Sequence, residues 1–152
     1  MAIAEVVALD TNILVYADDP TSPFHSVARH ILEEGLLGRR RLCVSPQILA
    51  EYFSVITSPR HGPNPLSPEE GAARAGRLAK SRRIGRVHPK RGTLARCLAS
   101  CAVRGLRGPR VFDALYAMTL LDNGVRTLLT ANVRDFTGIP GLKVINPFVQ
   151  HG

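Results

Sequence analysis

Four acidic residues stand in segments where a chain of alternating strands and helices can bring carboxylates together: Asp10, Glu51, Asp113 and Asp135. Asp10 directly follows an apolar stretch, residues 6–9, that has the composition of a buried strand. In an open α/β sheet, ligands bind outside the carboxyl ends of the strands, so Asp10 is placed for a metal or a phosphate. Mg²⁺ prefers oxygen ligands, and crowded carboxylates repel one another unless a cation neutralises them. The four acids therefore predict a divalent metal site.

The other three acids each have an ordinary structural interpretation as well. Glu51 lies in a predicted helix, where a solvated glutamate is the usual explanation. Asp113 is also explained as a first-turn acid that favours the helix dipole, and Asp135 as a residue that caps a turn or pairs with Arg134. Against these interpretations, Glu51 is surrounded by apolar residues, and charged side chains are rarely buried unless they are paired or bind a metal.

Strand and helix patterns alternate along the chain, which predicts an α/β fold with a mainly parallel central sheet of about five strands flanked by helices. The predicted strands are residues 5–9, 42–44, 84–88, 126–130 and 142–145. The predicted helices are residues 13–17, 23–37, 46–57, 92–103 and 111–121, with a further helix that starts at Pro68. Ser22, Ser45 and Ser67 are the expected N-caps of three of them. The length of 152 residues predicts one domain, residues 1–152.

The net charge of +8 comes mostly from arginine, and the basic residues are clustered along the sequence. The clusters are residues 39–41, 82–83 with 86, 90–91, and Arg104, Arg107 and Arg110. The planar guanidinium group suits phosphate oxygens, so a polyanionic partner is favoured, and nucleic acid is the usual one. A solvated, arginine-rich surface is the alternative for any single cluster.

The sequence shows no sign of a membrane span, a signal peptide or a zinc site. No apolar run approaches the roughly 20 residues that cross a bilayer, and the N-terminus lacks the pattern of a signal peptide. A cytoplasmic protein without a membrane partner is therefore expected. The cysteines, Cys43, Cys97 and Cys101, lack further ligands at zinc spacing, so they are expected to pack in the core.

The four acidic segments resemble, in their order and spacing, the motifs of PIN-domain proteins. The segments are LDTN (residues 9–12), SPQILAE (45–51), FDALYA (112–117) and LTANVRDF (129–136). The tail, residues 139–147, looks like the closing strand of that family. The most similar group is the VapC-like toxins of bacterial and archaeal type II toxin–antitoxin modules. The resemblance covers essentially the whole chain, and residues 62–110 match least specifically.

The resemblance implies a ribonuclease with Mg²⁺ as its cofactor, or Mn²⁺ in its place. Asp10, Glu51 and Asp113 match the metal-binding, catalytic acids of the family, and Asp135 is the candidate for the fourth. The family often places an aspartate where this chain has Asn132, three residues before Asp135. Either residue is therefore a candidate for the fourth position, and Asn132 would leave the site with one negative charge fewer.

The resemblance also implies roles for residues beside the acids. Thr11 or Asn12 would orient a ligand or a metal-bound water, and Thr130 would hold a water. Arg107 and Arg110 are the candidates for contacts with substrate phosphates, because they lie just before Asp113.

The implied chemistry is attack of a metal-activated water on an RNA phosphodiester, leaving a 5′-phosphate and a 3′-hydroxyl. No protein nucleophile is needed. A toxin of this type would pair with a small VapB-like antitoxin whose C-terminal segment blocks the site, and it would form a homodimer.

Several alternatives share parts of this pattern. A phosphatase of the haloacid dehalogenase type needs a second acid where this chain has Asn12, which cannot protonate a leaving group. A response-regulator receiver domain needs adjacent early acids and a late lysine on elements that this chain does not provide. Two alternatives stay open: a PIN-like module that binds RNA or protein without catalysis, and a housekeeping RNA-processing nuclease without an antitoxin.

Overall fold

The computed structural model describes residues 3–149 and contains a five-stranded sheet in which every pair of neighbouring strands is parallel. The strand order is β3-β2-β1-β4-β5. The strands are β1 (Val6–Leu9), β2 (Arg41–Val44), β3 (Ile84–Arg86), β4 (Thr127–Leu129) and β5 (Lys143–Ile145). The predicted α/β class and the five strands are confirmed, with boundaries that differ by one or two residues.

The helices fall in the predicted segments. They are α1 (Thr11–Asp18), α2 (His25–Leu36), α3 (Pro46–Thr57), α4 (Pro68–Lys80), α5 (Thr93–Arg104) and α6 (Arg110–Asp122), with a short 3₁₀ helix, η1 (Val133–Phe136), near the C-terminus. Two of the predicted N-caps are confirmed. The Ser45 hydroxyl accepts from the amide of Ile48, and Ser67 forms a capping box with Glu70 at the start of α4.

The predicted start of α2 was wrong. The helix begins at His25, and its N-cap position is Phe24, which makes no side-chain cap. The hydroxyl of Ser22 accepts instead from the amide of Phe24, at 3.1 Å, within the turn that leads into the helix. Serine stabilises turns by the same local hydrogen bonds that make it a cap, so the sequence pattern did not separate the two uses.

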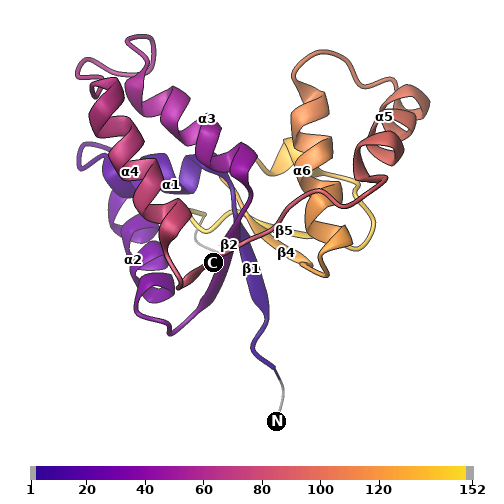
Figure 1. Ribbon diagram of the computed structural model, residues 1–152, viewed down its shortest axis with the longest axis horizontal. Coiled ribbons are helices and arrows are strands. Elements are labelled where there is room, and N and C mark those ends of the chain that lie inside the picture. Colours follow the sequence, from indigo (N-terminus) through magenta and orange to yellow (C-terminus); the bar gives the residue numbers. More distant parts are fainter. Residues whose placement is uncertain (1–2, 150–152) are drawn as a thin grey trace.

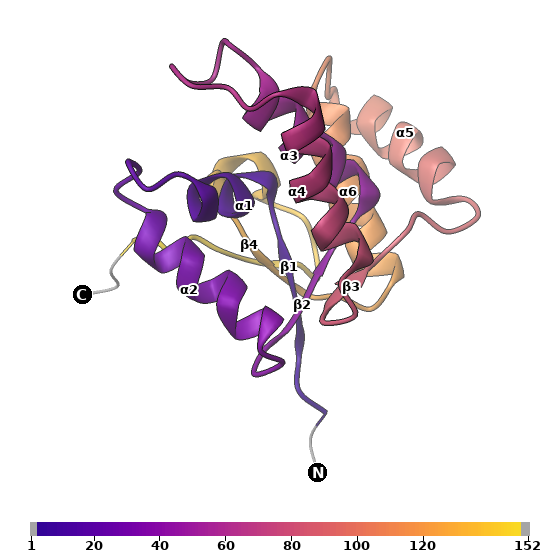
Figure 2. The same cartoon turned by 60° about the vertical axis from the view of Figure 1, so that its left-hand side comes forward.

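The helices cover the sheet in two groups, as Figures 1 and 2 show: α1 to α4 lie on one side and α5 with α6 on the other. Within the first group α1 packs against α2 and α3, and α3 packs against α4. A parallel sheet covered in this way buries both faces of its strands, which explains why β1, β2 and β4 are almost continuously apolar. None of the helices between residues 3 and 149 is long and apolar enough to cross a membrane.

The core follows from this arrangement. Leu9, Ile13, Leu128 and Leu120 are fully shielded from solvent, and they come from β1, α1, β4 and α6. The three cysteines are buried and unpaired, as predicted, with Cys97 and Cys101 of α5 in a small second cluster against α6.

Candidate functional site

Asp10 is fixed at the carboxyl end of the central strand by three hydrogen bonds. It is the N-cap of α1, and its Oδ1 accepts from the amide of Thr11 at 2.7 Å. Its Oδ2 accepts from the hydroxyl of Thr130 at 2.6 Å and from the side-chain amide of Asn12 at 3.2 Å. Only 8% of Asp10 is exposed. The carboxylate is therefore held in one orientation in a nearly buried position, which is typical of a functional group rather than of a surface acid.

Thr130 sits at the end of β4, the strand next to β1, so the parallel register brings it beside Asp10. Its hydroxyl donates to Asp10 and accepts from the side chain of Asn12, at 3.2 Å, and from the amide of Asn132, at 2.9 Å. These bonds use its donor and both lone pairs. The Thr130 hydroxyl thus links Asp10 to Asn12 and to the loop after β4.

Asn12 completes this connection between the two strand ends. Its side-chain oxygen accepts from the amide of Ala131, at 3.0 Å, while its nitrogen donates to Asp10 and Thr130. The predicted supporting residues are therefore brought together, and their observed contacts fix the backbone that leads to Asp135.

Glu51 comes from α3 and reaches the same place. Its Oε2 accepts from the hydroxyl of Thr11 at 2.9 Å, and its Oε1 accepts from the side-chain amide of Gln47 at 2.9 Å. Gln47 also donates to the carbonyl of Phe112, at 3.0 Å, in the first turn of α6. It therefore connects Glu51 to the helix that carries Asp113.

Gln47 was not among the site residues predicted from the sequence. Its only signal there is its position four residues before Glu51, which places the two side chains on one face of a helix. The contact with Phe112 joins residues 65 apart in sequence, and no local pattern predicts it.

Asp113 lies in the first turn of α6 and is half-buried. Burial raises its pKa to about 6, and the negative charges of Asp135, Asp10 and Glu51 act in the same direction. Arg110, one turn earlier, opposes this increase. The pKa of Asp10 is also raised, first by burial and then by Glu51 and Asp135, against hydrogen bonds from Thr130 and Thr11. The structure therefore brings all four predicted acids into one electrostatic neighbourhood.

Asp135 and Asn132 are the alternatives for the fourth position. Both are exposed and line the same shallow surface hollow. The charge of Asp135 acts on Asp113 and on Asp10. Asn132 contributes its backbone amide, which donates to Thr130, and its side chain makes no cap for η1.

The carboxylates of the site suit a divalent metal that keeps part of its water shell. Between residues 3 and 149, no three His, Cys, Asp or Glu side chains lie close enough to form a ready-made cage of ligands. Mg²⁺ does not need one, because it usually keeps several waters and is held directly by one or two carboxylates. Asp10 and Asp113, whose pKa values are raised by burial and then by neighbouring negative charges, fit a hydrated cation of this kind.

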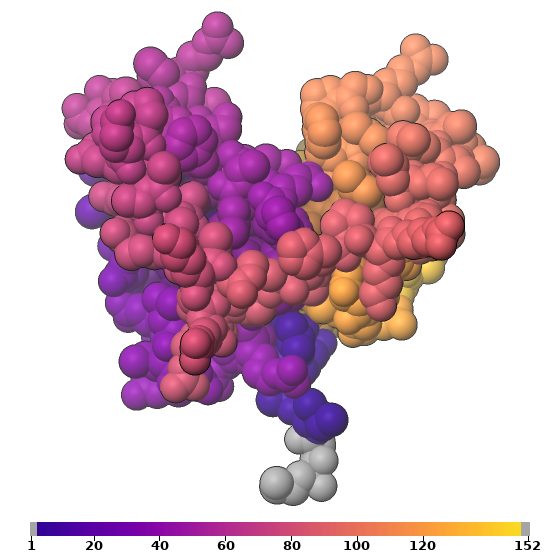
Figure 3. Space-filling model, in the orientation of Figure 1, coloured from indigo at the N-terminus to yellow at the C-terminus, as the bar shows by residue number. Residues whose placement is uncertain are grey.

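The predicted phosphate-binding arginines have different positions. Arg110 is the first residue of α6 and lies near Asp113, as its influence on that pKa shows. Arg107 is exposed in the loop between α5 and α6. Figure 3 shows the surface hollowed between the part formed by α3 and α4 and the part formed by α5 and α6. Glu51 and Asp113 come from opposite sides of this hollow.

Comparison with known proteins gives a consistent result. No family model matches the chain. Ribonuclease VapC24 of Mycobacterium tuberculosis is 28% identical over 147 residues, which are 97% of this chain and 100% of that protein. Ribonuclease VapC48 of the same organism is 25% identical over 139 residues, 91% of this chain and 95% of that protein.

Solved structures share the fold. The toxin–antitoxin complex VapBC2 of Rickettsia felis, solved with a DNA fragment from its promoter, contains a chain with a TM-score of 0.64, 24% identity, and coverage of 93% of this chain and 98% of that one. VapC20 of Mycobacterium tuberculosis, described as a toxin that cleaves the sarcin–ricin loop, has a TM-score of 0.61, 12% identity, and coverage of 80% and 86%. The chain is therefore similar to VapC ribonucleases along almost its whole length, and it shares the fold of VapC toxins.

Proposed function

We propose that this protein is a metal-dependent endoribonuclease and the toxin of a type II toxin–antitoxin pair. The observation that carries the proposal is the gathering of Asp10, Glu51, Asp113 and Asp135 at the carboxyl edge of the sheet, where two of them have raised pKa values because of burial and mutual repulsion. The relatives named ribonucleases, which match along almost their whole length, support RNA as the substrate.

In this proposal Asp10 and Asp113 hold the cation, with Glu51 and Asp135 beside them, and Mg²⁺ or Mn²⁺ fits the oxygen donors equally well. When bound, the metal supplies activation of a water and stabilisation of the leaving oxygen in phosphodiester hydrolysis. Asp135 rather than Asn132 is the proposed fourth residue, because its charge acts on Asp10 and Asp113.

The surrounding residues prepare the site without taking part in bond formation. Thr130 and Asn12 hold the Asp10 carboxylate in place, while Thr11 and Gln47 hold Glu51. Arg110, and Arg107 in the preceding loop, are the proposed contacts for substrate phosphates, since a polyanion that enters an acidic site needs positive charge nearby.

The proposal also covers the protein partner, the oligomeric state and the location in the cell. The structural neighbours include VapBC complexes, which supports a small VapB-like antitoxin as the partner that blocks the site. A homodimer, a location in the cytoplasm and a single domain over residues 1–152 complete the proposal.

The test is cleavage of total cellular RNA by the purified protein with EDTA, Mg²⁺ or Mn²⁺, together with Asp10→Asn. We expect discrete fragments that require metal and a loss of at least about 100-fold in rate for the variant, since Asn removes a ligand charge. Asp19→Asn, which alters an exposed acid in the loop after α1, is the matched control and should cleave normally.

Equal activity of Asp10→Asn and the unaltered protein would contradict the site assignment. RNA binding that needs no metal, with no cleavage under any condition, would instead indicate a PIN-like binding module. Cleavage without any antitoxin encoded beside the gene would indicate a housekeeping nuclease.

A further inference from the structure

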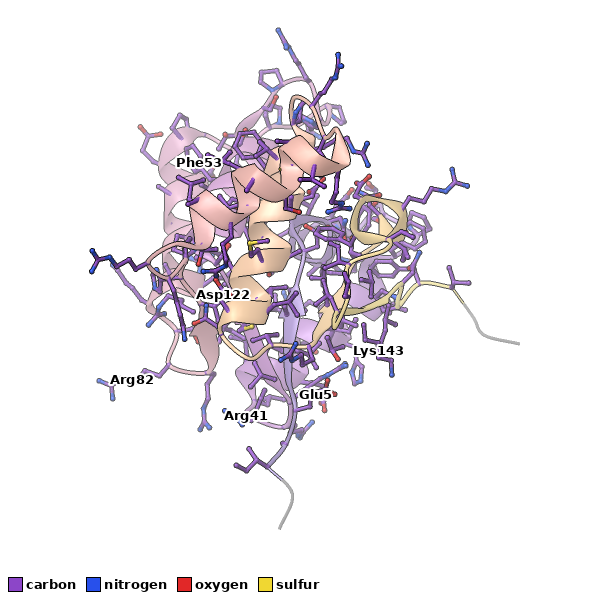
Figure 4. All side chains as sticks on the ribbon, turned by 90° about the vertical axis from the view of Figure 1, so that its right-hand side faces the viewer. Glu5, Arg41, Phe53, Arg82, Asp122 and Lys143 are labelled. Carbon is purple, nitrogen blue, oxygen red and sulfur yellow. The ribbon has the colours of Figure 1, made fainter. Side chains whose placement is uncertain are left out.

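The amino ends of the five parallel strands lie at the edge of the sheet opposite Asp10, and basic residues collect there. Parallel pairing places the first residues of neighbouring strands side by side, as the pairs Val6–Arg41 and Thr127–Lys143 show. We call this surface the basic edge; its residues are Arg39, Arg40, Arg41, Arg82, Arg83, Arg126 and Lys143, all exposed. Figure 4 shows Arg41, Arg82 and Lys143 at this end of the molecule, around Glu5.

The positive charge of the basic edge is not cancelled by the acids near it. Glu5 accepts from the hydroxyl of Thr127, and Glu34 is paired with Arg39 at 3.1 Å. Within residues 3–149, no hydrogen bond or ion pair engages the side chains of Arg82, Arg126 or Lys143. These cations are therefore available to an external partner.

Arg126 and Lys143 also share a shallow surface hollow. Arg126 directly precedes β4 and Lys143 begins the neighbouring β5, and they line the hollow together with Glu5 and Thr127. The hollow thus offers a guanidinium and an ammonium group against the single carboxylate of Glu5, and two such cations suit the oxygens of a phosphate group.

We infer that the basic edge is a second RNA-binding surface, which contacts the phosphate backbone of a folded RNA away from the acidic site. The inference rests on the proposed ribonuclease function, because that function supplies a polyanion of sufficient size. The four acids of the candidate site act on one another at the carboxyl edge of the sheet, while the basic edge holds seven cations with only Glu5 and Glu34 among them. A four-residue strand spans only about 13 Å, so a folded RNA at the acidic site is large enough to reach the basic edge.

The consequence concerns the choice of substrate. A fragment of two or three nucleotides that fills the acidic site is too short to reach the basic edge as well, whereas a folded RNA contacts both. Phosphate contacts contribute affinity without reading sequence. The basic edge would thus favour folded RNAs over such short fragments, and the residues near the acidic site would still decide where cleavage occurs.

The test measures RNA binding in EDTA, so that it does not depend on cleavage. The probes are fluorescently labelled bulk transfer RNA and a labelled trinucleotide, followed by anisotropy over a range of salt concentrations. The variant is Arg126→Gln with Lys143→Gln. The control, Arg29→Gln with Arg77→Gln, removes the same charge from exposed positions on α2 and α4.

We expect the Arg126/Lys143 variant to bind transfer RNA about tenfold more weakly, and its dependence of log K on log salt to be shallower by about 2, since each lost phosphate contact removes about 1 from that slope. The trinucleotide should bind equally to the variant and to the unaltered protein. Exchange of the two cations, Arg126→Lys with Lys143→Arg, should restore most of the affinity for transfer RNA.

Three outcomes would overturn the inference. One is unchanged transfer RNA binding by the Arg126/Lys143 variant. Another is an equal loss in the α2/α4 control, which would mean that net charge alone is responsible. The third concerns vesicles of anionic lipid. If the unaltered protein binds them and the Arg126/Lys143 variant does not, while both bind RNA equally, the basic edge binds a membrane surface instead. Failure of the ribonuclease proposal is seen separately, as absence of cleavage in Mg²⁺ and Mn²⁺.

Discussion

At the scale of single residues, the acidic site depends on side chains that are not acidic. Asp10 and Glu51 are each held by hydrogen bonds from neutral donors, so that neither carboxylate needs to find its orientation when a ligand arrives. Such preorganisation is a general requirement of metal and catalytic sites, because partners of the ligands fix their geometry. The donors therefore contribute to function as much as to stability.

Gln47 gives the clearest test of this view. Gln47→Met keeps the length of the side chain but removes the donor to Glu51 and to the carbonyl of Phe112. We expect metal-dependent RNA cleavage to fall about 10- to 100-fold, as for other partners of metal ligands, and the free energy of unfolding to change by only about 1 kcal/mol. Ser54→Met, an exposed change on the same helix, is the control for both measurements.

A cleavage rate equal to that of the unaltered protein would show that Glu51 does not need Gln47. A large loss of stability would show instead that the contact between α3 and α6 is mainly structural.

The raised pKa of Asp113 makes the stability of the metal-free protein depend on pH. Its pKa is about 6 in the folded protein, against an ordinary value of 3.8 for an aspartate. The folded state therefore binds the proton more tightly, so this stabilisation is complete below about pH 4 and is lost as the pH rises through 6. Asp113→Asn, which stays neutral, should match the unaltered protein near pH 4 and should unfold at a higher temperature at pH 7.5.

The measurement is thermal unfolding in EDTA at both pH values. Asp19 provides a control of opposite sign, because hydrogen bonds from Thr21 lower its pKa. Asp19→Asn should therefore cost stability at pH 7.5. A variant at Asp113 that is less stable at pH 7.5 would contradict the electrostatic interpretation of the site.

At the scale of elements, the close packing of α3 against α4 positions Glu51, and it depends on a small residue. A Cβ added to Gly71 would overlap Cγ2 of Thr57 and lie 3.2 Å from the ring of Phe53. Thr57 cannot easily turn away, since its hydroxyl donates to the carbonyl of Phe53 at 2.8 Å. Gly76, on the same helix, has open space around it.

Alanine at these two glycines should have opposite effects. Gly76→Ala should stabilise the protein by about 0.5–1 kcal/mol, because alanine is the better helix former. At Gly71 the steric cost of about 1–3 kcal/mol exceeds this gain, so Gly71→Ala should be destabilising. Urea unfolding of the two variants provides the comparison, and an increase in stability for both would mean that α4 moves away from α3 without cost.

At the scale of the whole molecule, α6 connects the two groups of helices. Its Tyr116, Ala117 and Leu120 belong to the main core, and its Ala114 joins Cys97 and Cys101 of α5 in the small cluster. The hydroxyl of Tyr116 also donates to the carbonyl of Leu9, at 2.6 Å, just before Asp10. One helix thus belongs to both clusters and is bonded to the central strand.

This arrangement predicts cooperative unfolding of the chain as a single domain. Urea transitions followed by circular dichroism and by tyrosine fluorescence should coincide. An earlier transition confined to part of the helical signal would mean that α5 unfolds separately with its small cluster, and would contradict the single domain.

The sequence by itself determined the class of the fold, because alternating apolar strands and amphipathic helices leave few arrangements other than a covered parallel sheet. It also predicted the acidic candidates, because Asp10 directly follows an apolar strand and Asp113 lies in the first turn of a helix, and both are local features of the sequence. It could not predict the contact between Gln47 and Phe112 or the three hydrogen-bond partners of the Thr130 hydroxyl. It also could not decide whether Ser22 caps a helix or stabilises a turn.

Tertiary structure decided these points for a physical reason. Hydrogen bonds between residues distant in sequence form only where the sheet register and the helix packing bring donor and acceptor together, and local propensity carries no information about them. The same holds for the basic edge, whose residues are scattered along the chain and become neighbours only because the strands are parallel. The candidate acids and the basic clusters could be recognised in the sequence. Their hydrogen-bond partners, and the places of the acidic site and the basic edge at opposite ends of the strands, followed from the fold.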